Sequence, residues 1–430
     1  MESHSLSQPK VDDLERQLLN RLGQIEDLAM VASVLTSIKE LQSVLTVVMD
    51  LALRLVDGEV GLIFLEEKGD FHSKISWGVD ERFIRTLQYK DGLDLTTYCF
   101  QHRESAVLND LTIRGDGNLS VNSLICVPIK TASACFGVIV IVNKGQGGGF
   151  SDEDQQILEI LTNFVAVGID NYNLMQEQLR QQKVQQEMHI ARQIQETILP
   201  QNLRSLSGVD FGVSYFPAGE VGGDFYDVLP VTSDKFVVVI GDVSNKGVPA
   251  ALIMSAAAGI LKSTLRANPS IPANGLVATL NDILVSEIIR DREMFVTLFL
   301  ARFDMSARTL SCCNAGHLPG LLWTGKDKRV EELTVGGPIV GQFAGLPFEQ
   351  EIKHVESGDR LFLFTDGLTE AMDADRALFG RERVVQVFST EIALEPQEFC
   401  QTVKHWVDRF IDKAPAEWQD DFTTMQIRVN

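Results

Sequence analysis

Four acidic tracts in the C-terminal half of the chain carry the residues best suited to chemistry. They contain Asp224, Asp242, Asp366 and the pair Asp420 and Asp421, and each lies where a strand is expected to end in a turn. Carboxylates with no histidine or cysteine beside them are typical ligands of hard divalent cations such as Mg²⁺ or Mn²⁺. Because the tracts are far apart in the chain, the fold has to gather them. The sequence therefore predicts a divalent-cation site and metal-assisted hydrolysis.

Two of these aspartates follow apolar runs that are typical of buried strands. Asp242 comes after Phe236–Ile240, and Asp366 comes after Leu361–Phe364. Both runs are too short for a helix, and the first is rich in β-branched residues. A single such tract is usually a simple turn, in which Asp accepts local backbone hydrogen bonds. The combination of several tracts in strand context is what indicates a common rim with a metal site.

Composition narrows the class of protein. A chain of 430 residues predicts two or three domains, at about 100 to 200 residues each. The net charge of −21 argues against nucleic-acid binding, which needs a basic face. The six cysteines lack a CxxC pair or framework spacing, which favours reduced core thiols. No signal peptide and no apolar run of about 18 residues is evident, so we expect a cytoplasmic protein without a membrane span.

Hydrophobic periodicity divides the chain into four regions. Residues 1–23 have a short amphipathic pattern typical of a leading helix, and residues 24–173 read as helix, strands and helix. Residues 174–199 form a continuous helical pattern that ends at Pro200, and residues 200–430 carry the acidic tracts. The predicted class is therefore α+β, with two domains joined by a helical linker.

The linker pattern has an uneven heptad seam in which polar positions interrupt the apolar ones. Met175 and Leu179 are followed by Gln182 and Gln186. A seam of this kind predicts a weakly specified coiled coil, hence a homodimer, and such a helix could act as a switch. An inert spacer helix is the alternative.

Residues 24–173 resemble a GAF sensory domain, an antiparallel sheet flanked by helices. The resemblance rests on Asn143-Lys144, on the tract 150–154, in which Ser151 and Asp154 read as a helix N-cap pair, and on the long helix that follows. It implies a possible small-molecule ligand, and a module that serves only dimerisation is the alternative. Lys144 and Asp152 could form a salt bridge like that of cyclic-nucleotide-binding members, or could only close a loop. The predicted strands are 60–65, 71–77, 105–108, 124–129 and 136–142.

Cys99 and His102 leave two interpretations open within this region. Cys99 could attach a chromophore, with His102 beside it, but the neighbouring residues carry no further signal. A buried thiol is the simpler interpretation.

The tracts of residues 200–430 together resemble the PPM family of metal-dependent protein serine/threonine phosphatases, and most closely its SpoIIE and RsbU-like branch. The resemblance implies a β-sandwich flanked by helices. It also implies a site with two divalent cations, Mn²⁺ or Mg²⁺, and a catalytic role for Asp224, Asp242, Asp366 and Asp420. The motifs that carry it are 220–227, 242–251, 314–317, 365–370 and 420–423.

The same resemblance implies individual roles. Asp224 and Asp242 would lie between the two metals, and Asp227 would be a supporting or turn residue. The full implied ligand set is Asp224, Asp242, the carbonyl of Val243, Asp366, Asp420 and, as a less certain neighbour, Asp421.

Two residues in these motifs need separate comment. Asn245 replaces the first glycine of the commoner Asp-Val-Ser-Gly-Lys-Gly form, and Asn is the non-glycine residue that best tolerates a left-handed backbone. His317, in Asn-Ala-Gly-His, could be taken for a general acid, but its context favours a structural turn.

The expected function is a signal-regulated phosphatase that hydrolyses phosphoserine or phosphothreonine on a regulatory protein. By resemblance the substrate would be a STAS-type anti-anti-sigma protein in a partner-switching pathway. The alternative is a catalytically silent GAF-containing scaffold that binds a phosphoprotein partner. The sequence has neither a Cys-x5-Arg loop nor a P-loop that would indicate other phosphate chemistry.

Overall fold

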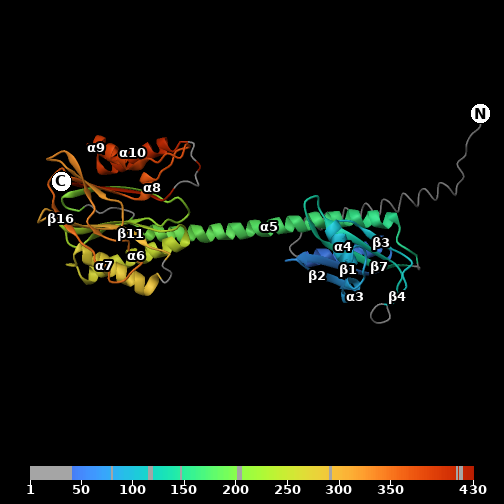
Figure 1. Cartoon of the computed structure of the whole chain (residues 1–430). Helices are drawn as coiled ribbons and strands as arrows, with labels where there is room; N and C mark the ends of the chain where they lie inside the picture. Colours follow the sequence, from blue (N-terminus) through green and yellow to red (C-terminus); the bar gives the residue numbers. More distant parts are fainter. Residues whose placement is uncertain are drawn as a thin grey trace, which may run out of the picture. The chain divides into compact units, whose positions relative to one another are not determined.

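The computed structural model of the protein describes residues 41–78, 81–114, 120–145, 148–200, 206–289, 293–412, 415 and 420–430. The chain divides into two compact units between Gln182 and Lys183. One helix, α5 (Asp152–Ile198), runs unbroken through that division (Figure 1). The exit helix and the linker helix predicted from the sequence are therefore one element. The helix predicted over residues 1–23 lies outside the described residues.

The described strands of the N-terminal unit form an antiparallel sheet in the order β2-β1-β7-β6-β3, with a small β4-β5 pair beside it. All five strands predicted from the sequence are confirmed. Helices α2 and α5 cover one face of the sheet and α4 packs with the other, so the central strands are buried on both sides. The elements are α2 (Leu41–Leu55), β1 (Gly58–Glu67), β2 (Asp70–Trp77), α3 (Glu81–Arg85), α4 (Leu95–His102), β3 (Ala106–Leu108), β4 (Ile113–Arg114), β5 (Ser120–Val121), β6 (Leu124–Lys130) and β7 (Cys135–Lys144).

The start of α5 is a reciprocal cap, as the sequence predicted. The backbone N–H of Asp154 donates to Ser151 Oγ at 3.3 Å, and the N–H of Ser151 donates to Asp154 Oδ2 at 2.8 Å. Lys144 pairs with Asp154, so the possible salt bridge between Lys144 and Asp152 is not the one that forms. The cap is the reason, because it turns the Asp154 carboxylate back toward the sheet while Asp152 stays exposed.

Cysteine placement agrees with reduced thiols. None of the six cysteines, all of which lie within the described residues, forms a disulfide. Cys99 is buried in the core beneath the sheet, which supports the buried-thiol interpretation. His102 stacks on Tyr98 with ring centroids 4.2 Å apart.

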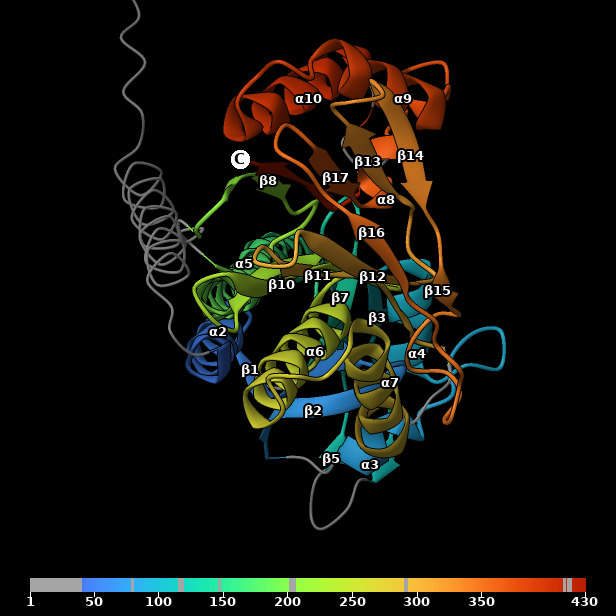
Figure 2. The ribbon, with the colours of Figure 1, turned by 90° about the vertical axis from the view of Figure 1, so that its left-hand side faces the viewer.

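In the C-terminal unit two sheets pack face to face between two layers of helices. The described strands give one sheet in the order β15-β12-β11-β10-β9, with β16 against β12, and a second in the order β14-β13-β17-β18-β8. Figure 2 shows α6 and α7 outside the first sheet and α9 and α10 outside the second. The predicted β-sandwich flanked by helices is confirmed.

The strands of this unit are β8 (Val209–Phe216), β9 (Phe225–Pro230), β10 (Lys235–Val243), β11 (Val296–Asp304), β12 (Thr309–Ala315), β13 (Gly320–Thr324), β14 (Arg329–Leu333), β15 (Gly336–Gly337), β16 (Glu351–His354), β17 (Arg360–Phe364) and β18 (Phe422–Val429). The helices are α6 (Val248–Ala267), α7 (Ala273–Ile283), a π-helical turn (Leu284–Ile288), α8 (Asp366–Thr369), α9 (Gly380–Thr390) and α10 (Pro396–Phe410).

One helix among the described residues, α6, is long and apolar enough by composition to cross a membrane. Its side chains Ala250, Met254, Ala257 and Leu261 are instead buried in the core that α6 shares with the first sheet. Helix α6 is therefore a core helix of this unit, and its apolar character follows from that burial.

Aromatic side chains fill the space between the two sheets. Phe236 on β10 is fully buried, stacks on Phe303 with ring centroids 4.8 Å apart, and meets Phe211 of the opposite sheet edge-on. Buried aromatic pairs of this kind contribute both apolar area and specific packing. They hold the two sheets, and so the loops at their edges, in a fixed relation.

Substituting Phe236→Ala should destabilise the C-terminal unit by about 3 to 5 kcal/mol, because it removes a buried ring and leaves a cavity. Urea unfolding followed by a signal from this unit measures the change. Leu252→Ala is the control, since that side chain on α6 is 65% exposed and its loss should cost less than about 0.5 kcal/mol. Equal destabilisation by both variants would contradict the assigned core.

Candidate metal centre

Strand register in the first sheet brings two of the predicted aspartates together. In the antiparallel pair β9 and β10, Phe225 lies opposite Gly241. Asp224, just before β9, is therefore a neighbour of Asp242 at the end of β10. The charge of Asp242 raises the pKa of Asp224, as expected of two carboxyl groups that lie close together.

Register in the second sheet does the same for the other two tracts. Phe364 on β17 lies opposite Thr424 on β18, so Asp366 comes close to the pair that precedes β18. The sequence placed all four tracts at strand ends, but the structure puts two of them, those of Asp224 and Asp420, immediately before strands. Neighbouring strands are antiparallel, so the end of one and the start of the next share an edge. The four tracts meet there.

Asp224 is the most buried member of this group. Its Oδ2 accepts hydrogen bonds from Thr365 Oγ1 at 2.7 Å and from Thr423 Oγ1 at 2.6 Å. Its Oδ1 is buried without a hydrogen-bond partner among the described residues. A buried carboxylate oxygen without a donor is costly unless a cation satisfies it.

The pKa values of the carboxyl groups reflect how close these groups lie to one another. Burial and then repulsion from Asp366 and Asp420 raise the pKa of Asp242 to about 7. Burial and repulsion from Asp420 raise the pKa of Asp366 to about 6. Burial and the Asp242 charge raise the pKa of Asp224 well above its usual value. The carboxyl groups at this edge therefore resist being ionised together unless a cation compensates their charge.

The adjacent residues Asp420 and Asp421 have different surroundings. The buried carboxylate of Asp421 accepts hydrogen bonds from the backbone N–H of Ala218 at 2.8 Å and of Gly223 at 2.6 Å. Asp420 is half-buried and lies 3.0 Å from the ammonium of Lys246. The carboxylate of Asp421 is therefore engaged in holding the loop before β9, whereas that of Asp420 lies beside a cation.

The loops around the group are shaped by backbone constraints. A Cβ at Gly223 would approach the carbonyl oxygen of Val243 to 2.8 Å, so only glycine allows this contact. Asn245 has φ of 68°, the left-handed conformation that the sequence argument expected Asn to tolerate. Ser244 ties the loop to Phe295 through a backbone bond of 2.9 Å and a side-chain bond of 2.8 Å.

His317 and Asp227 have supporting positions. Burial lowers the pKa of His317 to about 4, and its ring nitrogens contact Thr297 Oγ1 at 2.8 Å and the Phe364 carbonyl at 3.1 Å. Both ring nitrogens of His317 are thus engaged by neighbouring protein groups, in agreement with the structural-turn interpretation. Asp227 forms an ion pair of 2.8 Å with Lys262.

Sequence reasoning missed several residues that contact the group. Thr365 and Thr423 are the donors to Asp224, and Lys246 lies beside Asp420. Both threonines were inside quoted motifs, so their hydroxyls were an available signal. Gln195, on α5, bonds to the backbone of Gly222, a contact that sequence reasoning did not predict.

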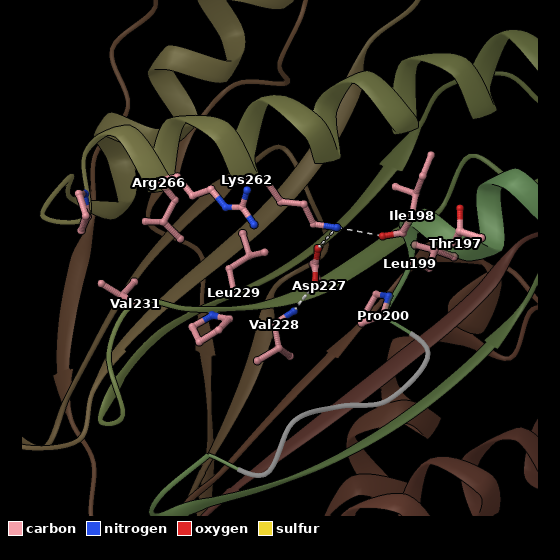
Figure 3. Close-up of a pocket in the computed structure, with 13 residues that line it drawn as sticks. Thr197, Ile198, Leu199, Pro200, Asp227, Val228, Leu229, Val231, Lys262 and Arg266 are labelled. Atoms are coloured by element: carbon pink, nitrogen blue, oxygen red, sulfur yellow. Dashed lines mark hydrogen bonds and ion pairs between the residues drawn. The ribbon is translucent and has the colours of Figure 1, made fainter.

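A cavity of about 770 Å³ lies elsewhere in the same unit (Figure 3). It is bordered by the last turn of α5, strand β9 and helix α6. Asp227 is its only lining residue from the acidic motifs. The cavity is therefore distinct from the place where the aspartates meet.

The described residues fit a cation site in charge and donor type. As they stand, no three described Asp, Glu, His or Cys side chains form a closed cage for a metal ion. The unpartnered oxygen of Asp224 and the oxygen-only donors nevertheless match what Mg²⁺ and Mn²⁺ require.

Comparison with known proteins finds a family match in each half of the chain. The GAF domain family matches residues 40–169, and the family described as stage II sporulation protein E (SpoIIE) matches residues 232–430. Phosphoserine phosphatase RsbU of Bacillus subtilis is 28% identical over 250 residues, which cover 58% of this chain and 71% of that protein. Protein IcfG of Synechocystis is 29% identical over 272 residues, covering 57% of this chain and 42% of that protein.

Among solved structures, the SiaA-PP2C domain of Pseudomonas aeruginosa has a TM-score of 0.52 at 20% identity, covering 58% of this chain and 99% of that domain. This likeness is one of fold. Together with the family matches it defines the C-terminal unit as a PPM-type protein phosphatase domain, a metal-dependent class of hydrolase. The chain is thus a GAF domain followed by a SpoIIE-type phosphatase domain.

The raised pKa of Asp242 predicts that the stabilisation of the fold by bound metal depends on pH. The folded carboxyl holds a proton up to about pH 7, whereas the unfolded one, with its usual pKa of about 3.9, does not. This group therefore lowers the stability of the metal-free protein as pH rises through that window, and a cation offsets the loss. Mn²⁺ should raise the unfolding midpoint more at about pH 8 than at about pH 6.

Scanning calorimetry with and without Mn²⁺ measures this increment. Asp304→Asn, at the opposite end of the β10–β11 pair, should keep the pH dependence, and Asp242→Asn should lose it. Equal increments at both pH values in the unaltered protein would contradict the assignment.

Proposed function

We propose that this protein is a signal-regulated phosphatase that removes phosphate from phosphoserine or phosphothreonine on a regulatory protein, using a water activated by two divalent cations, Mn²⁺ or Mg²⁺. The observation that carries the proposal is the convergence of Asp224, Asp242, Asp366 and Asp420 at one sandwich edge, with an unsatisfied oxygen on Asp224. The SpoIIE-type family match supports the reaction class.

Five residues would hold the ions. Asp224 and Asp242 would lie between them, the carbonyl of Val243 would contribute a further oxygen, and Asp366 and Asp420 would complete the shell of one ion. When bound, the two ions supply the Lewis acidity that lowers the pKa of a water and offsets charge on the phosphoryl oxygens.

The protein's own contribution is to orient these ligands. Thr365 and Thr423 fix one oxygen of Asp224 so that the other faces the site. Asp421 holds the backbone of the loop that delivers Asp224, so we assign it a positioning role and Asp420 the ligand role. Asp242, Asp366 and Asp420 are only half-buried, which leaves the edge open to a phosphorylated side chain.

The proposed substrate is a phosphorylated STAS-type protein of a partner-switching pathway. Support comes from the similarity to RsbU, which is described as a phosphoserine phosphatase. The GAF domain is the proposed sensor, with a small molecule as its possible signal. The net charge of −21 favours a protein partner over nucleic acid.

A homodimer through α5 is part of the same proposal. The helix exposes apolar side chains over much of its length, and a second copy of the chain would cover them. These residues are Leu174, Met175, Leu179, Val184 and Ile190, each about half exposed.

Replacing Asp242 or Asp366 with alanine should reduce Mn²⁺-dependent hydrolysis of a phosphoserine protein by about 100-fold or more, because each removes a ligand charge at the reacting phosphate. Release of inorganic phosphate measures the rate. Asp304→Ala is the control and should keep the activity of the unaltered protein. If the unaltered protein binds a phosphoprotein without turnover at any Mn²⁺ concentration, the silent-scaffold alternative holds.

Substitutions of Asp420 and Asp421 should have separable effects. Asp421→Asn places an amide donor against backbone N–H groups and should destabilise the metal-free protein by about 1 to 3 kcal/mol. Asp420→Asn should leave metal-free stability nearly unchanged and weaken Mn²⁺ binding. Urea unfolding and calorimetric titration measure the two quantities. The reverse pattern would exchange the two roles.

A further inference from the structure

The last turns of α5 reach the loop that carries Asp224 through one side chain, Gln195. This residue is 5% exposed although most of its neighbours on the helix face solvent. Its Nε2 donates to the carbonyl of Gly222 at 2.6 Å, and its Oε1 accepts from the N–H of Gly222 at 3.1 Å. Both ends of the carboxamide are thus used by one residue of the loop.

Gly222 is confined from the other side as well. A Cβ on it would lie 2.8 Å from Asp421 Oδ2 and 2.9 Å from Tyr215 Oη, so the backbone has no room to shift that way. Asp421 accepts from the N–H of Gly223, the next residue. The Gly222–Gly223 backbone, directly before Asp224, is therefore held by hydrogen bonds to Gln195 on one side and to Asp421 on the other.

The end of α5 is itself anchored to the phosphatase domain. Lys262 on α6 donates to the carbonyl of Ile198 at 2.9 Å and pairs with Asp227 on β9 at 2.8 Å (Figure 3). Leu199 is buried in the core beneath α6. The 770 Å³ cavity borders this segment on one side.

We propose that Gln195 is a positioning residue for the metal centre: its carboxamide holds the Gly222 peptide so that Asp224 presents its free oxygen to the cations. The inference rests on the proposed function and adds a residue outside the acidic motifs. Loss of these two hydrogen bonds leaves the Gly222 N–H and C=O without partners and lets the loop relax. Since groups that orient a ligand affect metal affinity, the consequence is weaker metal binding.

Three variants of the full chain test this assignment. Gln195→Met keeps the side-chain length and a good helix former while removing both hydrogen bonds. Gln195→Glu keeps the acceptor for the Gly222 N–H but sets a carboxylate against the Gly222 carbonyl. Gln193→Met is the matched control, because Gln193 is exposed on the same helix two residues earlier.

Calorimetric titration with Mn²⁺ is the primary readout, and phosphate release against Mn²⁺ concentration is the second. Gln195→Met and Gln195→Glu should raise the Mn²⁺ dissociation constant by about 10-fold to 100-fold, while kcat at saturating Mn²⁺ stays close to that of the unaltered protein. Gln193→Met should change neither quantity.

Unchanged Mn²⁺ affinity in a folded Gln195 variant overturns the inference, as does an equal loss in Gln193→Met. If Gln195→Met fails to fold, Gln195→Glu decides the same question. Failure of the proposed function has a different signature: an unaltered protein that binds Mn²⁺ and turns over no phosphoprotein leaves the affinity comparison intact.

Discussion

The concentration of carboxyl groups at one edge of the sandwich is the constraint on which the rest of the phosphatase domain depends. Burial and mutual repulsion raise the pKa of Asp224, Asp242 and Asp366. The fold therefore keeps close together three carboxyl groups that repel one another when they are ionised. Two threonine hydroxyls satisfy one oxygen of Asp224 and leave the other unpaired. A divalent cation is the natural counterpart of such an arrangement.

The sandwich makes that arrangement possible because each sheet contributes one antiparallel pair. Strands β9 and β10 bring Asp224 and Asp242 to one side, and β17 and β18 bring Asp366 and Asp420 to the other. Stacked and edge-on phenylalanines between the sheets resist relative movement. The site is therefore formed across two rigid layers, and loops with glycine at close approaches complete it.

Helix α5 gives the two domains a shared element. It begins with the Ser151–Asp154 cap beside the GAF sheet and ends among the contacts of Gln195 and Ile198 in the phosphatase domain. Because one continuous helix carries both sets of contacts, a change at its start and the loop before Asp224 are connected by covalent structure. The physical link is a few hydrogen bonds at the helix end.

Local patterns in the sequence predicted the strands of the GAF domain and the acidic tracts, whereas the β-sandwich and the individual ligand roles were implied by the family resemblance that the motifs carry. Periodicity and turn chemistry are local properties, so they can be recognised without coordinates. Tertiary structure decided what depends on contacts between distant segments. It paired Lys144 with Asp154, turned Asp421 toward the backbone, and brought Gln195 to Gly222. Such contacts follow from strand register and packing, which no local pattern encodes.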